Sequence, residues 1–134
     1  MLVAQAALEA GGFEVATAGD GVMAVEEFAR QRPDLVILDV VMPRMDGFEA
    51  CREIRATPAG RDVPILIMTS REDVEAVARA YDSGATDFTS KGISNRLMIE
   101  RVRFLLREAN ARRQLVVSRS RLATVQRMAR IGHW

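Results

Sequence analysis

Three residues whose side chains could take part in covalent or ionic chemistry lie at the ends of separate apolar runs. Asp39 ends DLVILD, Thr69 ends VPILIMT, and Lys91 directly follows ATDFTS. A carboxylate can act as a nucleophile toward phosphorus and form an aspartyl phosphate. A lysine ammonium and a hydroxyl group can each bind an oxygen of the transferred group. These residue types favour phosphoryl chemistry, provided that the fold brings the three run ends together.

The elements around these residues alternate between two kinds of apolar pattern. Apolar residues recur at helical spacing in some segments, and short apolar runs separate those segments. Continuous aliphatic runs such as DLVILDVV are typical of parallel strands that are buried on both faces. We expect helices at 2–10, 19–31, 47–56 and 70–84, and strands at 13–18, 34–41, 63–70 and 85–90.

This alternation predicts an α/β fold, a doubly wound parallel sheet with helices on its faces. In such sheets, ligand chemistry is found at the carboxyl ends of the strands. Asp39, Thr69 and Lys91 are therefore expected at one edge of the sheet. Each residue also has an ordinary structural explanation, since Asp39 could cap a turn, Thr69 could belong to a helix cap and Lys91 could be solvated. Those explanations predict no common location, so we favour the functional one.

Composition sets broad limits on the protein. A chain of 134 residues that is 49% hydrophobic and 28% charged can form one domain with a real core and an extension. No apolar stretch has the length of a transmembrane helix, and no signal peptide opens the chain. Cys51 is the only cysteine, which excludes an internal disulfide bond. These features favour a cytoplasmic protein.

The near-neutral net charge hides an uneven distribution. Residues 1–100 contain 10 Lys and Arg against 17 Asp and Glu, a net charge of −7. Residues 101–134 contain 9 Arg and one Glu, a net charge of +8. The acidic body and the basic tail are therefore expected to be separate structural units.

At residues 1–106 the sequence resembles the receiver domain of bacterial two-component response regulators. The resemblance is carried by DLVILDVVMPRMDGFE, VPILIMTS and GATDFTSKGI, with LEAGGFEVATAGDGVMAVE upstream. It implies a flavodoxin-like sheet and a regulatory role without enzymatic turnover. The implied phosphoryl donor is a sensor histidine kinase or a phosphotransfer protein.

The resemblance also implies a role for particular residues. Asp39 would be the phospho-acceptor and, with the backbone carbonyl of Val41, would bind Mg²⁺. Thr69 would be the switch hydroxyl, Phe88 the switch aromatic, and Lys91 the partner of the phosphoryl group. A phenylalanine on a short strand is, from its residue type, more often a core residue.

One departure from the family pattern concerns the start of the sheet. Receivers begin with a central strand that ends in two acidic residues, and this sequence has neither feature. From typical element lengths, we expect about 15–20 residues of the family pattern to be missing. A shortened chain, a sheet in which 13–18 pairs directly with 34–41, and a strand supplied by another chain all remain open. Without the acidic pair we expect weak or absent Mg²⁺ binding.

A second departure follows Lys91, where the family usually has proline. Gly92 stands there instead. Because a cis peptide bond before a residue other than proline costs about 2.5–4 kcal/mol, we expect a trans bond.

Helical spacing continues from Ser94 to Ile131, which predicts a connector over residues 107–131. The positions of its seam, of which one is the polar Ser118, alternate by fours and threes, as in a weak coiled coil that could join two copies of the chain. These positions are Ala111, Leu115, Ser118, Leu122, Val125 and Ala129. A solvated helix face remains possible. Nucleic-acid binding ranks lower, because no DNA-reading module is recognisable.

The last residues, QRMARIGHW, resemble the start of a PAS domain over a few positions. Residues 132–134 are therefore expected to begin a further domain, and His133 to be a packing residue. The leading hypothesis is a receiver module that accepts a phosphoryl group on Asp39 and signals through a dimerising helix. The alternative is a pseudo-receiver that acts by protein contact without phosphorylation. A phosphatase is less favoured, because Val40 and Val41 offer no second acid beside Asp39.

Overall fold

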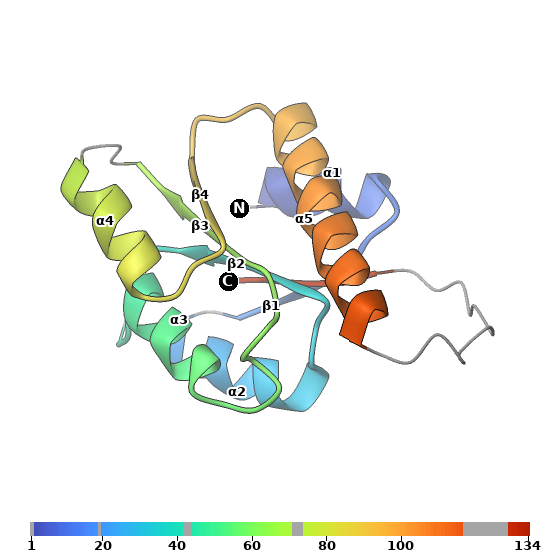
Figure 1. The fold of residues 1–134 in the computed structure, drawn as a ribbon. Coiled ribbons are helices and arrows are strands. Elements are labelled where there is room, and N and C mark those ends of the chain that lie inside the picture. The colour runs from blue at the N-terminus through green and yellow to red at the C-terminus, as the bar shows by residue number, and fades with distance from the viewer. Residues whose placement is uncertain (1, 19, 42–43, 71–73, 117–128) are drawn as a thin grey trace.

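The computed structural model describes residues 2–18, 20–41, 44–70, 74–116 and 129–134. Helices and strands alternate along the chain (Figure 1). The helices are α1 (Leu2–Ala10), α2 (Gly21–Gln31), α3 (Gly47–Arg55), α4 (Val74–Asp82) and α5 (Asn95–Val116). The strands are β1 (Glu14–Thr17), β2 (Leu35–Asp39), β3 (Ile65–Thr69), β4 (Asp87–Ser90) and β5 (Arg130–His133).

The five strands form one parallel sheet in the order β1-β5-β2-β3-β4. Figure 1 shows α1 and α5 on one side of the sheet, and α2, α3 and α4 on the other. The predicted doubly wound α/β fold is confirmed, with element bounds within a few residues of those expected.

The two central aliphatic strands are buried on both faces. Every residue of β2 and β3 is buried. Val36 and Leu38 face the core under α2 and α3, whereas Leu35 and Ile37 face the core under α1 and α5. Burying both faces explains why these strands are continuous apolar runs rather than alternating ones.

The largest difference from the sequence-based expectation is β5. The helix predicted as far as Ile131 is wrong at its end, because Arg130 and Ile131 lie in a strand. α5 is described as far as Val116, and the rest of the predicted connector, residues 117–128, lies outside the described residues. Gly132 and His133 belong to β5 and Trp134 is 2% exposed, so these residues are part of this domain's core rather than outside it.

β5 also changes the expectation of a gap in the sheet. β1 does not pair directly with β2; β5 lies between them and pairs in parallel with both. Ile131 enters the core under α1 and α5, and Trp134 enters the core on the opposite face. The physical reason is that the backbone groups of β1 and β2 would otherwise be buried without hydrogen-bond partners.

Candidate functional site

Asp39 is the last residue of β2 and is 8% exposed. Its Oδ2 lies 2.8 Å from the Nζ of Lys91, which directly follows β4. Its Oδ1 accepts a hydrogen bond of 3.1 Å from the backbone N–H of Val41. The structure therefore brings together a carboxylate and an ammonium that are separated by two strands in the sequence.

Thr69 lies at the same edge, at the end of β3. Asp39 is opposite Met68 in the parallel register, so Thr69 is one residue further toward the carboxyl edge. The backbone N–H of Lys91 donates to the carbonyl of Thr69 at 2.9 Å, which fixes the Lys91 loop against β3. The three sequence-predicted residues thus share one edge of the sheet. Cis peptide bonds are not found among the described residues, and the predicted trans bond between Lys91 and Gly92 is confirmed.

The loop after Asp39 is shaped by the Asp-Gly pair at its end. Asp46 caps α3, because its Oδ1 accepts a hydrogen bond of 2.9 Å from the N–H of Glu49. A Cβ atom at Gly47 would lie 2.3 Å from the carbonyl oxygen of Asp39. Instead, the N–H of Gly47 donates to the carbonyl of Val40 at 3.0 Å. Glycine is required here because α3 begins in contact with the backbone that carries the acid.

A second ion pair, which was not expected from the sequence, lies near this edge. The guanidinium of Arg44 lies 2.7 Å from Oδ2 of Asp20, the N-cap of α2. Arg44 has a φ of 66°, a left-handed conformation that is unusual for a residue other than glycine. The hydrogen bond from the N–H of Met23, with a further contribution from Arg44, holds the pKa of Asp20 below its ordinary value. This pair ties the loop after Asp39 to the start of α2.

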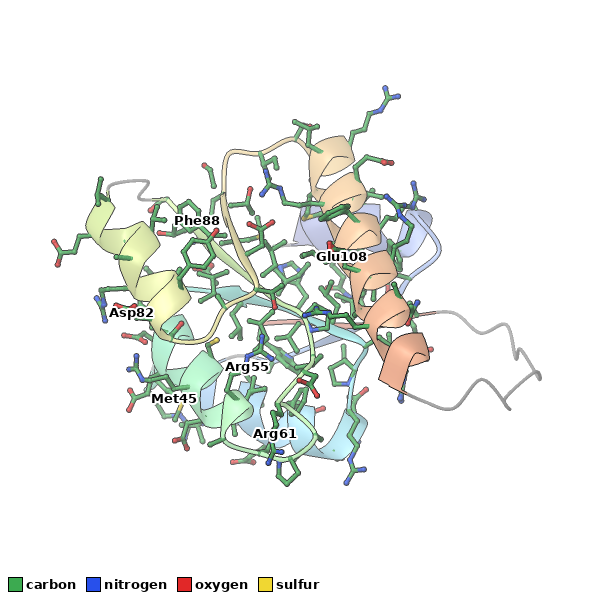
Figure 2. All side chains as sticks on the ribbon, in the orientation of Figure 1. Met45, Arg55, Arg61, Asp82, Phe88 and Glu108 are labelled. Carbon is green, nitrogen blue, oxygen red and sulfur yellow. The ribbon has the colours of Figure 1, made fainter. Side chains whose placement is uncertain are left out.

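Phe88 lies on the side of β4 that faces α4 (Figure 2). It is half-buried and packs against the core that includes Ala80. A shallow hollow beside it is lined by Phe88, Thr89, Ser90, Gly92, Ile93 and Arg101. Arg101 of α5 borders this hollow, where its guanidinium lies 3.0 Å from Oδ2 of Asp87.

The carboxyl end of β5 reaches the same edge beside Asp39. The N–H of Asp39 donates to the carbonyl of Trp134 at 2.6 Å. His133 is 3% exposed, and burial lowers the pKa of its imidazole to about 4. The strand next to β2 thus ends in an imidazole and an indole rather than in carboxylates.

The donor groups at this edge fit a magnesium ion poorly. Mg²⁺ prefers oxygen ligands, with one or two carboxylates in addition to phosphate and water. Within the described ranges, no group of three or more His, Cys, Asp or Glu residues could hold a metal ion. Asp39 already binds Lys91 and Val41. The role of the Val41 carbonyl as a metal ligand stays a prediction.

The predicted dimer positions fall largely outside the structure. Ala111 is exposed on α5, and Leu115 lies in the same helix. Ser118, Leu122 and Val125 lie outside the described residues. The dimerising seam therefore stays a prediction.

A parallel α/β sheet with an acid, a hydroxyl and a lysine at its carboxyl edge defines a class of phospho-accepting signalling domains. The response regulator receiver domain model matches residues 1–103, and the chain belongs to that family. Receiver domains of two-component systems accept a phosphoryl group and interact with histidine kinases or phosphotransfer proteins. They are in general regulators rather than enzymes.

Curated relatives agree with this assignment. The chain is 46% identical over 96 residues to the response regulator MprA of Mycobacterium leprae, covering 72% of this chain and 41% of that protein. It is 43% identical over 99 residues to MprA of Mycobacterium sp. strain KMS, covering 74% and 42%. The chain thus spans about two fifths of the length of these relatives.

Solved structures share the fold. A putative response regulator from Chloroflexus aurantiacus matches with a TM-score of 0.75 and 29% identity, over 79% of this chain and 87% of that one. The receiver domain of the sensor histidine kinase PA1611 from Pseudomonas aeruginosa matches with a TM-score of 0.71 and 33% identity, over 81% and 87%. That domain was solved with a magnesium ion in its active-site cleft. In the described part of the present chain, no helix is both long and apolar enough to span a membrane.

Proposed function

We propose that this chain is a receiver module that accepts a phosphoryl group on Asp39 from a phosphohistidine of a sensor kinase or phosphotransfer protein. A carboxylate oxygen of Asp39 forms a bond to phosphorus while the phosphorus–nitrogen bond of the donor breaks, and the imidazole leaves. The observation that carries the proposal is the 2.8 Å ion pair between Asp39 and Lys91 at the carboxyl edge. After transfer, the Lys91 ammonium is in place to pair with a phosphoryl oxygen.

The same proposal assigns the signalling step to neighbouring residues. The hydroxyl of Thr69 binds the new phosphoryl group, which is a dianion. Phe88 then moves together with the loop that carries Thr69. The change passes to α5, whose continuation joins two copies of the chain and leads to an output domain. The hollow beside Phe88 supports this route, because Arg101 of α5 lines it together with β4 residues.

A pseudo-receiver without phosphoryl transfer is the second candidate. It is favoured by one observation, the replacement of carboxylates by His133 and Trp134 at the end of the strand beside β2. Because His133 and Trp134 supply no carboxylate beside Asp39, we expect Mg²⁺ to bind weakly. Calorimetric titration tests this, and an affinity like that of an ordinary receiver would contradict it.

Phosphoramidate, which contains a phosphorus–nitrogen bond, separates the two candidates. The wild-type chain is expected to gain the mass of one phosphoryl group, and Asp39→Asn to gain none. Asp46→Asn is the matched control, because asparagine also caps helices and this residue lies in the loop after Asp39. An unlabelled wild-type chain, or labelling of Asp39→Asn equal to that of the wild type, would exclude phospho-acceptance by Asp39.

A further inference from the structure

The loop between Asp39 and α3 is joined by an ion pair to the start of α2. The guanidinium of Arg44 donates to Oδ2 of Asp20, through Nε at 2.9 Å and through Nη2 at 2.7 Å. Asp20 is the N-cap of α2, where its Oδ1 accepts a hydrogen bond of 2.9 Å from the N–H of Met23. One carboxylate therefore caps the helix and binds the loop at the same time. We call the pair of Arg44 with Asp20 the loop latch.

The backbone conformation of Arg44 is unusual for its residue type. Its φ of 66° lies in the left-handed region. A residue other than glycine holds such a conformation where surrounding contacts impose it, and residues of this kind gather at functional sites. The Arg44 side chain is 59% exposed, so burial contributes little, whereas the Asp20 side chain is only 12% exposed. The loop latch is therefore a contact that holds Arg44 in this conformation.

The residue after Arg44 contacts α2 as well. Met45 is half-buried and packs against the core that includes Ala24 and Phe28 of α2. A Cβ atom at Gly21 would overlap the carbonyl oxygen of Met45, so the backbones of α2 and the loop lie in contact. Two consecutive residues thus hold this side of the loop against one helix.

A short path leads from the loop latch to the backbone of the acid. Arg44 lies three residues before Gly47, the first residue of α3. The N–H of Gly47 donates to the carbonyl of Val40 at 3.0 Å, and a Cβ atom at Gly47 would overlap the carbonyl oxygen of Asp39. The N–H of Val41 in turn donates to Oδ1 of Asp39 at 3.1 Å. A shift of Arg44 relative to α2 is therefore expected to move the start of α3 and, with it, the backbone that carries Asp39.

We propose, on the basis of the phospho-acceptor role proposed for Asp39, that Arg44 is a positioning residue for phosphoryl transfer. It acts through the loop latch on the backbone of Asp39, and not as a ligand of the phosphoryl group. Catalysis of phosphoryl transfer depends largely on positioning and electrostatic stabilisation. The latch preserves the geometry in which Oδ2 of Asp39 lies 2.8 Å from Nζ of Lys91. A misplacement of about 1 Å can slow a reaction about a hundredfold, so a small movement of this loop is enough.

A double-mutant cycle in the labelling rate tests the latch. Arg44→Gly removes the guanidinium and suits the positive φ. Asp20→Asn removes the charge and still caps α2, because asparagine and aspartate are equally good N-caps. Each single change is expected to slow the labelling of Asp39 by phosphoramidate about fivefold, and the double variant to label no more slowly than either single variant. Fivefold effects that multiply in the double variant would show two independent roles and overturn the proposal.

The dependence of the rate on phosphoramidate concentration separates positioning from binding. The maximal rate is expected to fall in both latch variants, while the half-saturating concentration stays within about twofold of the wild-type value. Arg32→Gly is the matched control, because Arg32 is also exposed and left-handed, with a φ of 46°, at the other end of α2. This variant is expected to label at the wild-type rate. A wild-type maximal rate in Arg44→Gly would overturn the proposal.

Hydrogen exchange of the Gly47 amide gives a measurement that needs no phosphorylation. Because its hydrogen bond to Val40 depends on the latch, this amide is expected to exchange about fivefold faster in Arg44→Gly and Asp20→Asn, and at the wild-type rate in Arg32→Gly. Unchanged exchange in both latch variants would overturn the proposal, whether or not the chain takes a label. An unlabelled wild-type chain whose Gly47 exchange still responds would contradict the role of Asp39 and support the link from the latch to its backbone.

Discussion

At the residue scale, the site depends on a few side chains with distinct electrostatic surroundings. Asp39 is nearly buried, and its carboxylate lies 2.8 Å from the ammonium of Lys91. Asp20 is engaged by Arg44 on the other side of the loop. His133, the only histidine of the chain, is buried and held neutral beside this edge. Each of these surroundings has a measurable consequence.

Replacing Lys91 by methionine is expected to slow the labelling of Asp39 by phosphoramidate at least tenfold. The transferred group loses a positive charge that pairs with its oxygens, and a tenfold change corresponds to about 1.4 kcal/mol. Because the Lys91 side chain is 39% exposed, the free energy of unfolding should change by less than about 1 kcal/mol. Lys91→Arg keeps the charge and should label at an intermediate rate. An unchanged rate in Lys91→Met would remove Lys91 from the site.

Because the His133 imidazole is buried, we expect the domain to lose stability at acidic pH. Its folded-state pKa of about 4 lies below the ordinary value of 6.5. Above pH 6.5 both states are neutral and the residue has no effect. As the pH falls from 6.5 to 4, the unfolded state binds a proton that the folded state does not, so the free energy of unfolding falls by about 3 kcal/mol.

Urea unfolding at pH 7.5 and at pH 4 measures this effect. His133→Leu lacks the titrating group. Between pH 7.5 and pH 4, its free energy of unfolding should therefore fall by about 3 kcal/mol less than that of the wild-type chain. Carboxylates titrate equally in both chains and cancel in the comparison. Parallel pH profiles for the two proteins would contradict burial of a neutral imidazole in β5.

At the scale of elements, close approach of backbones shapes the loop that carries Asp39. α3 starts against the end of β2, with the Gly47 N–H on the carbonyl of Val40. α2 starts against the same loop, because a Cβ atom at Gly21 would lie 2.1 Å from the carbonyl oxygen of Met45. The first residues of α2 and α3 therefore both contact the loop after Asp39. Each of these residues is a glycine, which permits the close approach of the backbones.

Gly47→Ala is expected to destabilise the domain by about 1–3 kcal/mol and to reduce labelling of Asp39. The added methyl group would lie 2.3 Å from the Asp39 carbonyl oxygen, so the start of α3 or the end of β2 must move. Gly92→Ala is the matched control, because its methyl group would meet only Ser90 Oγ at 3.5 Å. Urea unfolding and phosphoramidate labelling are the measurements. Equal stability of the two variants would contradict the close approach at Gly47.

At the scale of the whole molecule, the sheet joins parts of the chain that are far apart in sequence. The β2–β3–β4 part follows from neighbouring βα units, whereas β1 is joined to it within the sheet through β5. The N–H of Arg130 donates to Oδ2 of Asp34 across 96 positions of sequence. The integrity of the sheet therefore depends on a distant four-residue strand that pairs with both β1 and β2.

Trp134, the only tryptophan, can report on this segment. Its fluorescence is expected to shift to longer wavelength at a lower urea concentration than the loss of ellipticity at 222 nm, because β5 opens before the helices unfold. In the control, Phe13→Trp with Trp134→Phe, the reporter lies in the core under α1 and α5. Its fluorescence should change together with the ellipticity. Coincident transitions in the wild-type chain would show that β5 unfolds with the rest.

The sequence by itself determined the α/β class, the four strands of the first 90 residues and the common edge of Asp39, Thr69 and Lys91. Each follows from local patterns, since aliphatic runs of strand length and helical spacings are set within a few residues, and parallel strands end at one edge.

Only the tertiary structure decided the fate of residues 130–134. Locally, Arg130 and Ile131 continue a helical spacing, and nothing near them indicates a strand. The requirement for a strand at these residues comes from other parts of the chain. The backbone groups of β1 and β2 that face each other need hydrogen-bond partners, and the cores on both faces of the sheet need apolar side chains. The ion pair of Arg44 with Asp20 is likewise a contact between separate elements. Such requirements between distant parts of the chain override the local helix propensity. They cannot be inferred from the sequence before the positions of the neighbouring strands are known.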